Sequence, residues 1–352
     1  MNLLERTARA ATAVTTPLLP DDYLQYVNPL WSTREPRGRI EAVLPETPDS
    51  ATIWIRPGLG WARQHVPGQY VRMGIDIDGV RHWRTYSITS VPRRDDGRFS
   101  ICVKAIPDGF VSAHLVRETR AGTMVRLAPP AGDFTLPEPL PTKTLFVTAG
   151  SGITPVMGML RAHVNLQDVV HVHLARNAWD VIFGAELRRR THQVAGYVLH
   201  EHHDDREGRF DLGRLDELVP DWRDRESWAC GPAGLLDGLA ERFAAARVPE
   251  RLHIERFRPV VAAGATGAGG TITFQASGKT ADAGGATPIL VAGEDAGALL
   301  PNGCRMGICH TCVGRLCSGA VIDLRTGELH DDEGELVQTC VSAPAGDVVI
   351  DL

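Results

Sequence analysis

The chain has 352 residues, of which 43% are hydrophobic and 23% charged, with a formal net charge of -6 and a sequence pI of about 6.1. This length exceeds what one compact core normally holds, so we expect two or three domains. The acidic balance leaves no basic surplus to neutralise phosphates, which argues against a nucleic-acid partner.

The first residues, MNLLERTARA, place Glu5, Arg6 and Arg9 where an export signal would need an apolar run, so we expect no signal peptide. No run of roughly 18 apolar residues is found, so we expect no membrane span. The seven cysteines, an odd number, do not fit a disulfide framework. A reducing compartment, the cytoplasm, is therefore expected.

Residues 1–36 form an N-terminal extension whose side chains Tyr23, Tyr26 and Trp31 are aromatic. We expect this aromatic-rich segment to pack on the domain that follows, and contact with a membrane partner is the more specific alternative. Residues 37–139 alternate short apolar stretches with turn residues, at 51–57, 68–76, 82–90, 98–105 and 122–130. This spacing predicts a small antiparallel β-barrel.

Two motifs in the predicted barrel could bind a ligand. In RTYS, Arg84, Tyr86 and Ser87 lie near the end of a predicted strand, where they suit a phosphate, an aromatic ring and a ring nitrogen. An ordinary surface pair is the alternative. In GFVS, Gly109 and Ser112 open a predicted helix whose free N–H groups could hold a diphosphate, and a plain helix cap is the alternative.

Residues 140–257 change to apolar runs that alternate with helix-like stretches, which predicts a parallel sheet covered by helices. Gly150, Gly152 and Thr154 directly follow an apolar strand, where a glycine turn lets the backbone approach a dinucleotide phosphate. The turn departs from G-x-G-x-x-G because Pro155 follows. A second strand ends in a site formed by Cys230, Gly231 and Pro232, at the sheet edge where ligands bind.

Residues 258–270 are almost free of charge and bulk, which predicts a flexible linker before a small domain at 271–352. The spacing Cys304-x4-Cys309-x2-Cys312, with Cys340 far downstream, is the plant-type [2Fe–2S] pattern. Zinc, the alternative, usually takes two close cysteine pairs. Cys317 falls outside the pattern and is expected to be buried and unreactive.

These motifs, in this order from about Arg37 to Leu352, resemble the ferredoxin–NADP reductase superfamily, specifically flavin reductases fused to a C-terminal ferredoxin. The resemblance implies a multidomain protein with an antiparallel β-barrel flavin domain, an α/β parallel-sheet nucleotide domain and an α+β (β-grasp) ferredoxin domain. It implies that Arg84, Tyr86 and Ser87 bind FAD, with FMN left open. It also implies that Cys230 lies by the hydride-donating carbon and that Phe257 shields the flavin ring.

Three arginines, Arg176, Arg206 and Arg209, follow predicted strands with no acidic residue directly beside Arg176. Arginine near the ribose favours NADPH over NADH, so NADPH is the expected donor. The alternative is that these are solvated loop side chains, and NADH then remains open. The histidines at 171–173 and 200–203 lack metal-site spacing and are expected at strand ends and in loops.

The N-terminal extension is similar, through residues 20–24 and 28–31, to that of actinobacterial reductases that serve membrane-bound diiron acyl desaturases and alkane hydroxylases. That resemblance implies a cytoplasmic protein held peripherally at the inner membrane face by its partner. A soluble Rieske-type oxygenase is the competing acceptor. A redox-sensing regulatory module is a third alternative, and the complete path from nicotinamide to cluster argues against it.

Overall fold

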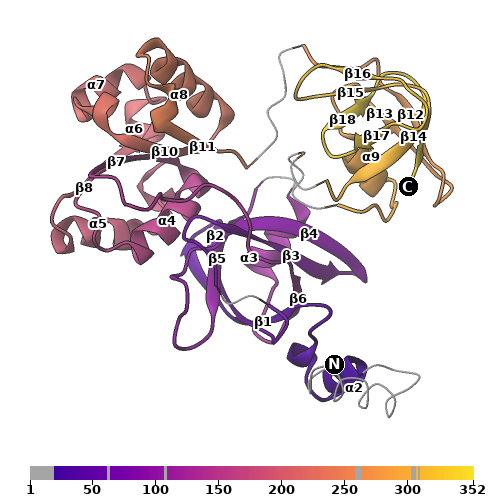
Figure 1. The fold of residues 1–352 in the computed structure, drawn as a ribbon, viewed down its shortest axis with the longest axis horizontal. Coiled ribbons are helices and arrows are strands. Elements are labelled where there is room, and N and C mark those ends of the chain that lie inside the picture. Colours follow the sequence, from indigo (N-terminus) through magenta and orange to yellow (C-terminus); the bar gives the residue numbers. More distant parts are fainter. Residues whose placement is uncertain (1–19, 62–63, 107–108, 258–263, 303–306, 308–309) are drawn as a thin grey trace, which may run out of the picture. The chain divides into compact units, whose positions relative to one another are not determined.

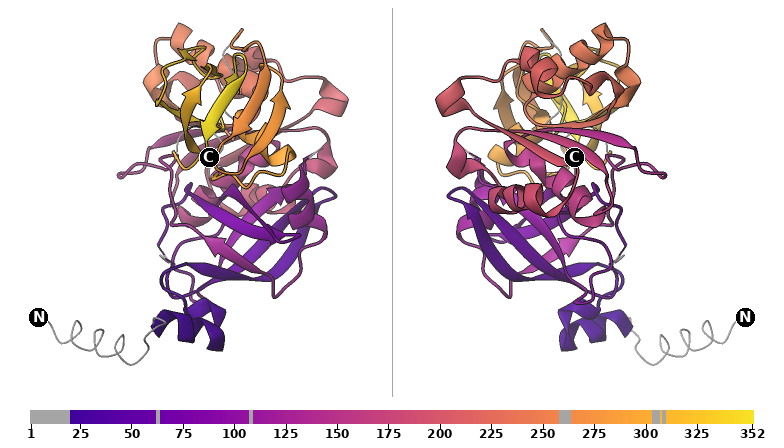
Figure 2. Two further views of the ribbon diagram at one scale, coloured as in Figure 1. Left: turned by 90° about the vertical axis from the view of Figure 1, so that its right-hand side faces the viewer. Right: turned by 90° about the vertical axis from the view of Figure 1, so that its left-hand side faces the viewer.

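A computed structural model describes residues 20–61, 64–106, 109–257, 264–302, 307 and 310–352. The chain divides into two compact units (Figures 1 and 2). The first holds Met1–Asp76 and Tyr86–Glu255, and most of the second is Arg256–Leu352. Within the described ranges no helix is long and apolar enough to cross a membrane.

Six strands form the first sheet in the order β4-β3-β6-β1-β2-β5 (Figure 1). They are β1 (Arg37–Thr47), β2 (Ser50–Pro57), β3 (Tyr70–Ile77), β4 (Val80–Ser87), β5 (Phe99–Lys104) and β6 (Met124–Leu127). An isolated antiparallel bridge between Ile88 and Ile101 joins the chain just after β4 to β5. The two edge strands of the sheet therefore meet, which confirms the predicted antiparallel barrel.

The barrel interior is filled by side chains at every second position. In β2, Ala51, Ile53 and Ile55 are buried in turn, because successive side chains of a strand point to opposite faces. Strand β1, the longest, was not among the predicted strands. Its pairing with β2 is irregular between Ile40 and Ala42, and such irregularities break the two-residue alternation that reveals a strand in a sequence.

The N-terminal segment contains helix α2 (Pro20–Val27) and the short helix η1 (Pro29–Trp31), which lie at one end of the barrel (Figure 2). Leu30 is buried, and its carbonyl accepts a hydrogen bond from the backbone N–H of Leu59. Two aromatic side chains of the segment are exposed to solvent, Tyr26 at 83% and Trp31 at 39%. The segment thus packs on the barrel as predicted, with Leu30 as the buried contact and Tyr26 largely exposed.

The nucleotide domain has a five-stranded parallel sheet in the order β11-β10-β7-β8-β9. Its strands are β7 (Lys143–Ala149), β8 (Asp168–Ala175), β9 (Tyr197–His203), β10 (Glu226–Cys230) and β11 (Leu252–Glu255). Its helices are α4 (Ile153–Ala162), α5 (Gly184–Gln193), α6 (Asp204–Glu207), α7 (Leu215–Leu218) and α8 (Ala233–Ala245), with α3 (Phe110–Arg117) belonging to the barrel domain. Short helical turns complete the connections: η2 (Gly150–Gly152), η3 (Ala178–Asp180), η4 (Leu212–Arg214), η5 (Trp222–Asp224) and η6 (Pro249–Arg251).

Both faces of this sheet are covered. Phe146 of β7 packs with Ile153 and Leu160 of α4, whereas Val147, on the other face, packs with Leu236 of α8. Figure 1 shows α4 and α5 on one side of the sheet and α7 and α8 on the other. The predicted α/β domain is therefore confirmed.

Two histidines lie where the sequence did not place them. His171 and His173 are fully buried within β8, not at a strand end or in a loop. The Thr148 hydroxyl lies 2.7 Å from His171 Nε2 and 2.8 Å from His173 Nδ1, and Tyr197 OH lies 2.8 Å from His171 Nδ1. Burial lowers the pKa of both imidazoles, so they are neutral members of a core hydrogen-bond ladder.

The C-terminal domain has sheets in the orders β13-β12-β19-β14-β17 and β16-β15-β18. Its elements are β12 (Gly270–Phe274), β13 (Lys279–Ala283), α9 (Ile289–Asp295), β14 (Val313–Ser318), β15 (Val321–Asp323), β16 (Leu329–His330), β17 (Leu336–Gln338), β18 (Ser342–Pro344) and β19 (Val348–Asp351). Leu290 of α9 shares one core with Phe274 of β12, and the parallel β12–β19 pair lies between antiparallel neighbours. This is the predicted α+β ferredoxin-like arrangement.

Part of the predicted linker, 258–263, lies outside the described residues. The remainder contacts the C-terminal domain: Ala265 is buried, and the Gly267 N–H donates a hydrogen bond to the carbonyl of Gly285. The domain boundaries given above remain predictions.

Candidate functional site

The RTYS motif lies at the end of strand β4. Ser87, its last residue, is buried, and its Oγ has no hydrogen-bond partner among the described residues. Arg84 and Tyr86 are half-exposed, and Arg84 Nη1 donates to the carbonyl of Trp83 at 2.8 Å. A buried hydroxyl without a partner costs free energy, so it marks a position where a ligand would complete the hydrogen bonding. This fits the polar edge of a flavin.

The backbone just past Ser87 is fixed from two sides. The Ile88 N–H donates to the Gln69 carbonyl at 2.9 Å, and Arg161 Nη1 of α4 donates to the Thr89 carbonyl at 2.8 Å. The Thr89 hydroxyl lies 2.8 Å from the Ser100 hydroxyl. The strand end that carries the motif is therefore held by both the barrel and the nucleotide domain.

Gly109 and Ser112 form one local turn at the start of α3. Ser112 Oγ donates to the Gly109 carbonyl at 2.9 Å and accepts the Ile106 N–H at 3.2 Å. A Cβ at Gly109 would lie 2.3 Å from Ile106 Cγ1 and 2.5 Å from Ser112 Oγ, so only glycine fits. The serine closes the turn, and a diphosphate would be held by backbone N–H groups at the helix start.

The glycine turn after β7 lies against the end of β10. A Cβ at Gly152 would lie only 2.0 Å from the carbonyl oxygen of Cys230, and one at Gly231 would lie 3.0 Å from Cβ of Ala149. Gly150, by contrast, has φ +53° and open space around it. Thr154 is buried and its Oγ1 donates to the Ser151 carbonyl at 2.9 Å, which fixes the turn. Two predicted motifs are thus brought into contact by backbone packing.

Cys230 is fully buried at the carboxyl end of β10, and the next residues lead into α8, with Pro232 at its N-cap position. Burial, and then the charge of Glu255, raise the pKa of the Cys230 thiol well above its ordinary value. The thiol is therefore neutral at physiological pH. It cannot act as a thiolate nucleophile, but it can pack against a neutral ring.

Glu255 is a residue that the sequence analysis missed. It ends β11, in register with Cys230 of β10, and its Oε2 is buried without a hydrogen-bond partner among the described residues. Burial raises its pKa to about 8, so the carboxyl group is largely protonated at neutral pH. The sequence gives no clear signal for it, because His253 and Arg256 beside Glu255 are polar as well. Phe257, two residues on, is 42% exposed.

Of the three predicted phosphate-binding arginines, Arg176 is already engaged. Its Nη2 lies 2.7 Å from Asp49 Oδ2, and its Nε lies 2.6 Å from Asp180 Oδ2. Asp49 also binds Lys104 Nζ at 2.6 Å. Arg206 and Arg209 are exposed, and the Asp205 N–H donates to the Arg176 carbonyl at 2.9 Å, which joins the turns after β8 and β9.

Two of the four proposed cluster ligands lie outside the described residues, namely Cys304 and Cys309. The other two, Cys312 and Cys340, are buried and adjacent: a hydrogen bond with the Cys340 side chain is the main cause that lowers the pKa of the Cys312 thiol to about 6. Paired, readily ionised thiols suit an iron or zinc centre equally, so the spacing still carries the choice.

Cys317 does not match its prediction. It is half-exposed rather than buried, and its Sγ lies 3.2 Å from Gln275 Oε1. The alternation of β14 explains the difference: Gly314 and Leu316 are buried, so Cys317 lies with Arg315 on the opposite face.

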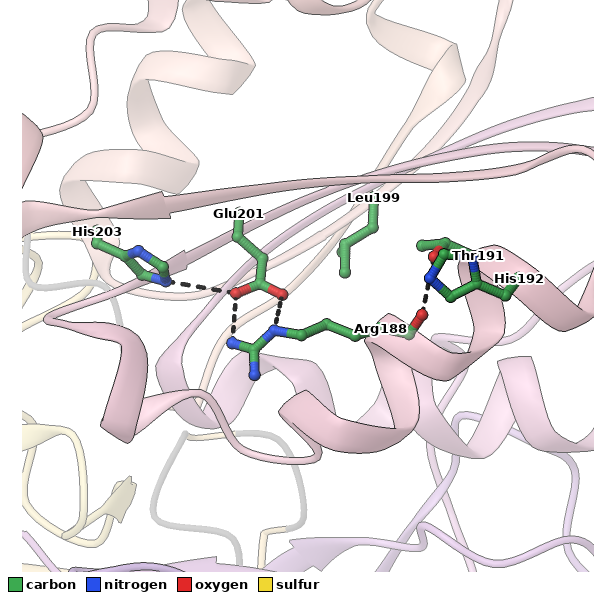
Figure 3. Close-up of a pocket in the computed structure, with 6 residues that line it drawn as sticks. All are labelled: Arg188, Thr191, His192, Leu199, Glu201 and His203. Carbon is green, nitrogen blue, oxygen red and sulfur yellow. Dashed lines mark hydrogen bonds and ion pairs between the residues drawn. The ribbon is translucent and has the colours of Figure 1, made fainter.

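A pocket that the sequence did not indicate lies between α5 and β9, lined by Arg188, Thr191, His192, Leu199, Glu201 and His203 (Figure 3). Arg188 makes a bidentate ion pair with Glu201 at 2.7 and 2.8 Å, and His203 Nε2 lies 3.4 Å from Glu201 Oε2. The Glu201 carboxylate is thus already paired with Arg188. None of the predicted site residues lines this pocket.

Comparison with known proteins gives the same cofactors as the sequence motifs. Residues 62–136 match the oxidoreductase FAD-binding domain, and residues 272–345 match the 2Fe-2S iron-sulfur cluster binding domain. The computed fold is similar to that of phthalate dioxygenase reductase, with a TM-score of 0.64 and 23% identity over 90% of this chain and 97% of that one.

Two relatives cover nearly the whole chain. An NADPH oxidoreductase of Mycobacterium tuberculosis is 52% identical over 98% of this chain and 91% of its own length. A glycine betaine monooxygenase reductase subunit of Pseudomonas aeruginosa is 30% identical over 93% of this chain and 99% of its own. Expectations of FAD, a [2Fe–2S] cluster and a reductase activity are therefore confirmed.

Proposed function

Because the chain belongs to the family of NAD(P)H-dependent flavin reductases that carry a C-terminal [2Fe–2S] domain and serve oxygenases, we propose that its electron donor is NADPH and its acceptor a membrane-bound diiron acyl desaturase or alkane hydroxylase. The observation that carries the donor half of this proposal is the contact of Gly152 with the end of β10. It brings a dinucleotide turn and Cys230 to one edge of the sheet.

In this proposal, FAD supplies the conversion between a two-electron hydride and single electrons, and the cluster accepts those electrons singly. The side chains and backbone of the protein bind and orient the two cofactors. Ser87 offers its hydroxyl to the flavin ring, Tyr86 its aromatic face and Arg84 its guanidinium to a phosphate. The turn that Gly109 and Ser112 form receives the diphosphate.

The nicotinamide nucleotide is held at the carboxyl edge of the parallel sheet. The open turn at Gly150 lets the backbone N–H groups approach its phosphates, while Gly152 keeps that turn against Cys230. The neutral thiol of Cys230, with Gly231 and Pro232 behind it, then forms an uncharged wall for the nicotinamide ring. An uncharged wall suits a ring that changes its charge on giving up a hydride.

Glu255 is proposed to hold a proton at this edge. With its pKa at about 8, the carboxyl group carries a proton on one oxygen at neutral pH and loses it only above that value. A carboxylate there would add a negative charge beside Cys230, and protonation removes it. Phe257, beyond the strand, is the proposed aromatic cover of the flavin.

NADPH is proposed over NADH because three arginines, Arg176, Arg206 and Arg209, follow the strands at this edge of the sheet. The name of the 52% identical relative supports this choice. Arg176 would have to exchange its contact with Asp49 or Asp180 for one with the 2′-phosphate. Arg206 and Arg209 would assist from the turn after β9, which the Asp205–Arg176 backbone hydrogen bond joins to the turn after β8. The cluster ligands are proposed to be Cys304, Cys309, Cys312 and Cys340.

The membrane acceptor is supported by the exposed apolar side chains of α2 and η1. Tyr26 and Val27 are largely exposed, beside Leu24 and Trp31, on a segment that contacts the barrel through Leu30 and through a hydrogen bond from Arg37 to Gln25. Exposed apolar groups concentrated in one segment indicate a binding surface. A soluble oxygenase is the second candidate, and the 30% identical relative, a monooxygenase reductase subunit, favours it.

The two acceptors can be distinguished with a Tyr26→Ser/Val27→Ser double variant. We expect it to deliver electrons to desaturase-containing membranes about 10-fold more slowly, since truncating a buried interface anchor commonly costs about 1–2 kcal/mol. Reduction of cytochrome c should not change. A matched control is Leu44→Ser, which removes an exposed apolar side chain from β1. Equal rates for all three proteins would refute the membrane acceptor, and coupling to a purified soluble oxygenase would then support the second candidate.

A further inference from the structure

An arginine outside the cysteine motif reaches into the cysteine loop. Arg325 follows strand β15, and its guanidinium is fixed by Asp323, with Nε 3.1 Å from Oδ1 and Nη2 2.6 Å from Oδ2. The same carboxylate accepts the Arg325 backbone N–H at 2.7 Å, and Asp323 is itself buried. The guanidinium therefore has a defined position on the domain, because a bidentate pair fixes its plane as well as its distance.

The other edge of the guanidinium contacts the loop between Cys304 and Cys309. Arg325 Nη1 donates to the Gly307 carbonyl at 2.9 Å, and Gln338 Nε2 donates to the same oxygen at 3.0 Å. Arg325 Nη2 in turn donates to Gln338 Oε1 at 2.9 Å. The Gly307 carbonyl thus accepts hydrogen bonds from two side chains, which are also hydrogen-bonded to each other.

Gly307 is shaped for this contact. Its φ is +71°, and a Cβ on it would lie 2.3 Å from Arg325 Nη1. The guanidinium occupies the space of the missing side chain. Glycine is thus required both by the left-handed backbone and by the arginine.

The segment that carries Arg325 also lies beside Cys340, the neighbour of Cys312. The Leu324 N–H donates to the Val341 carbonyl at 2.7 Å, and the Arg325 guanidinium contacts Gln338, two residues before Cys340. The hydrogen bond to Asp323 raises the pKa of Arg325, so the guanidinium stays charged. A second link joins these cysteines to the same region: Thr339 donates from both its Oγ1, at 2.8 Å, and its N–H, at 3.1 Å, to the Cys312 carbonyl. Charges and hydrogen bonds around the sulfur ligands set the potential of an iron–sulfur cluster.

We propose that Arg325 is a positioning residue of the cluster site: it anchors the cysteine loop through the Gly307 carbonyl and places a fixed positive charge beside Cys312 and Cys340. When the cluster is bound, that charge favours its reduced form, because reduction adds a negative charge. The inference rests on the proposed assignment of the four cysteines as ligands of a [2Fe–2S] cluster.

Anchoring and charge can be separated by three variants of the full chain. Arg325→Gln removes both the anchor and the charge. Arg325→Lys keeps the charge but loses the planar guanidinium that bonds Asp323 and Gly307 together. Gln338→Met removes the second donor to the Gly307 carbonyl without changing the charge. Arg315→Gln is the control, an exposed arginine on β14 of the same domain. Iron and labile sulfide per flavin, the rate of iron loss to a chelator and the cluster and flavin midpoint potentials are measured under anaerobic conditions.

Arg325→Gln should lose iron about 10-fold faster or more, in line with the effect of removing partners of metal ligands, and its remaining cluster should have a lower potential with an unchanged flavin potential. Arg325→Lys should lose iron faster while keeping most of the potential, and Gln338→Met should lose iron faster at an unchanged potential. The proposal is overturned if Arg325→Gln matches the Arg315→Gln control in both iron loss and cluster potential. If Arg325→Gln does not fold, Arg325→Lys and Gln338→Met decide by the same two readouts. A wild-type protein without a [2Fe–2S] spectrum would instead refute the ligand assignment.

Discussion

Two glycines in the proposed cofactor-binding loops are required for different reasons. Gly152, in the turn after β7, has an ordinary φ of -61°, but a Cβ there would lie 2.0 Å from the backbone carbonyl of Cys230. Gly307, in the cysteine loop, has φ +71°, and its nearest obstacle is the end of the Arg325 side chain. One loop is fixed by backbone on backbone, the other by a side chain that can move.

This difference determines which atoms must move when either glycine is substituted. The sheet edge that holds Gly152 cannot adjust without moving β10, whose residues are buried. The cysteine loop can adjust by moving a guanidinium, at the cost of the contacts that this group makes. The nucleotide site should therefore respond to substitution by losing its geometry, and the cluster site by losing its retention of iron.

The largest effect is expected for Gly152→Ala. The added Cβ must displace the end of β10, which should destabilise the protein by about 1–3 kcal/mol and slow hydride transfer from NADPH by about 100-fold, because misplacement of about 1 Å has effects of that size. Chemical denaturation and stopped-flow flavin reduction measure the two. The matched control is Gly234→Ala, since a Cβ at that helical position meets nothing within 4 Å. Equal behaviour of the two variants would contradict the backbone contact.

Gly307→Ala should act on the other loop. A left-handed backbone costs a non-glycine residue about 1–2 kcal/mol, and the Cβ would push Arg325 off the Gly307 carbonyl. We expect faster iron loss with normal flavin reduction by NADPH. The Gly307→Ala/Arg325→Ala double variant tests whether the two residues act together. Adding Gly307→Ala to Arg325→Ala should increase the rate of iron loss by a smaller factor than adding Gly307→Ala to the wild-type protein. Strict additivity of the two effects would show that the glycine and the arginine act separately.

Ser87 and Ser90 differ in whether the side-chain hydroxyl has a hydrogen-bond partner in the protein. Ser90 Oγ accepts the Ser100 N–H at 3.0 Å, whereas Ser87 Oγ has no partner among the described residues. Ser90→Ala should therefore destabilise the flavin-free protein by about 1–3 kcal/mol, and Ser87→Ala should not. Flavin reduction should show the opposite order, with Ser87→Ala slower by about 10-fold or more. Loss of flavin-free stability in Ser87→Ala would remove the basis for its assignment.

Arg176→Gln should lower kcat/KM for NADPH by about 10-fold while leaving NADH almost unchanged, since a hydrogen bond to a charged group contributes about 1.5–3 kcal/mol. Asp49→Asn should raise the preference for NADPH over NADH, because it removes the Asp49 ion pair of the Arg176 guanidinium. Lys104→Gln is the control, because it breaks the Lys104 contact of Asp49 without removing the Asp49 pair with Arg176. If Arg176→Gln affects both nucleotides equally, the arginine acts through structure and not through the phosphate.

Glu255→Gln is expected to change the pH dependence of stability. The folded-state pKa of about 8 exceeds the ordinary value of 4.5, so the folded protein binds more protons than the unfolded chain between these values. Wild-type stability should therefore fall as pH rises from about 5 to about 8, and Glu255→Gln should lack that part of the fall. Urea unfolding across this range, with the exposed Glu250→Gln as control, measures it. Parallel curves for wild type and Glu255→Gln would contradict the raised pKa.

The sequence predicted the order of domains and most strands, because alternation of apolar residues, glycine turns and cysteine spacing are local patterns. It missed what depends on contacts between distant segments. Glu255 became notable only through its register with Cys230, and Arg325 only through its reach to Gly307, 18 positions earlier. The buried pair His171 and His173 was misplaced for the same reason, since its partners Thr148 and Tyr197 come from two other strands.

The central claim is that one chain carries electrons from NADPH through a flavin to a [2Fe–2S] cluster. An anaerobic titration followed by visible spectroscopy tests it most directly, with NADPH and NADH added to separate samples. The account predicts flavin bands and a cluster shoulder that bleach with NADPH at far lower concentration than with NADH. A colourless, zinc-containing protein, or a cluster that stays oxidised after the flavin is reduced, would contradict it.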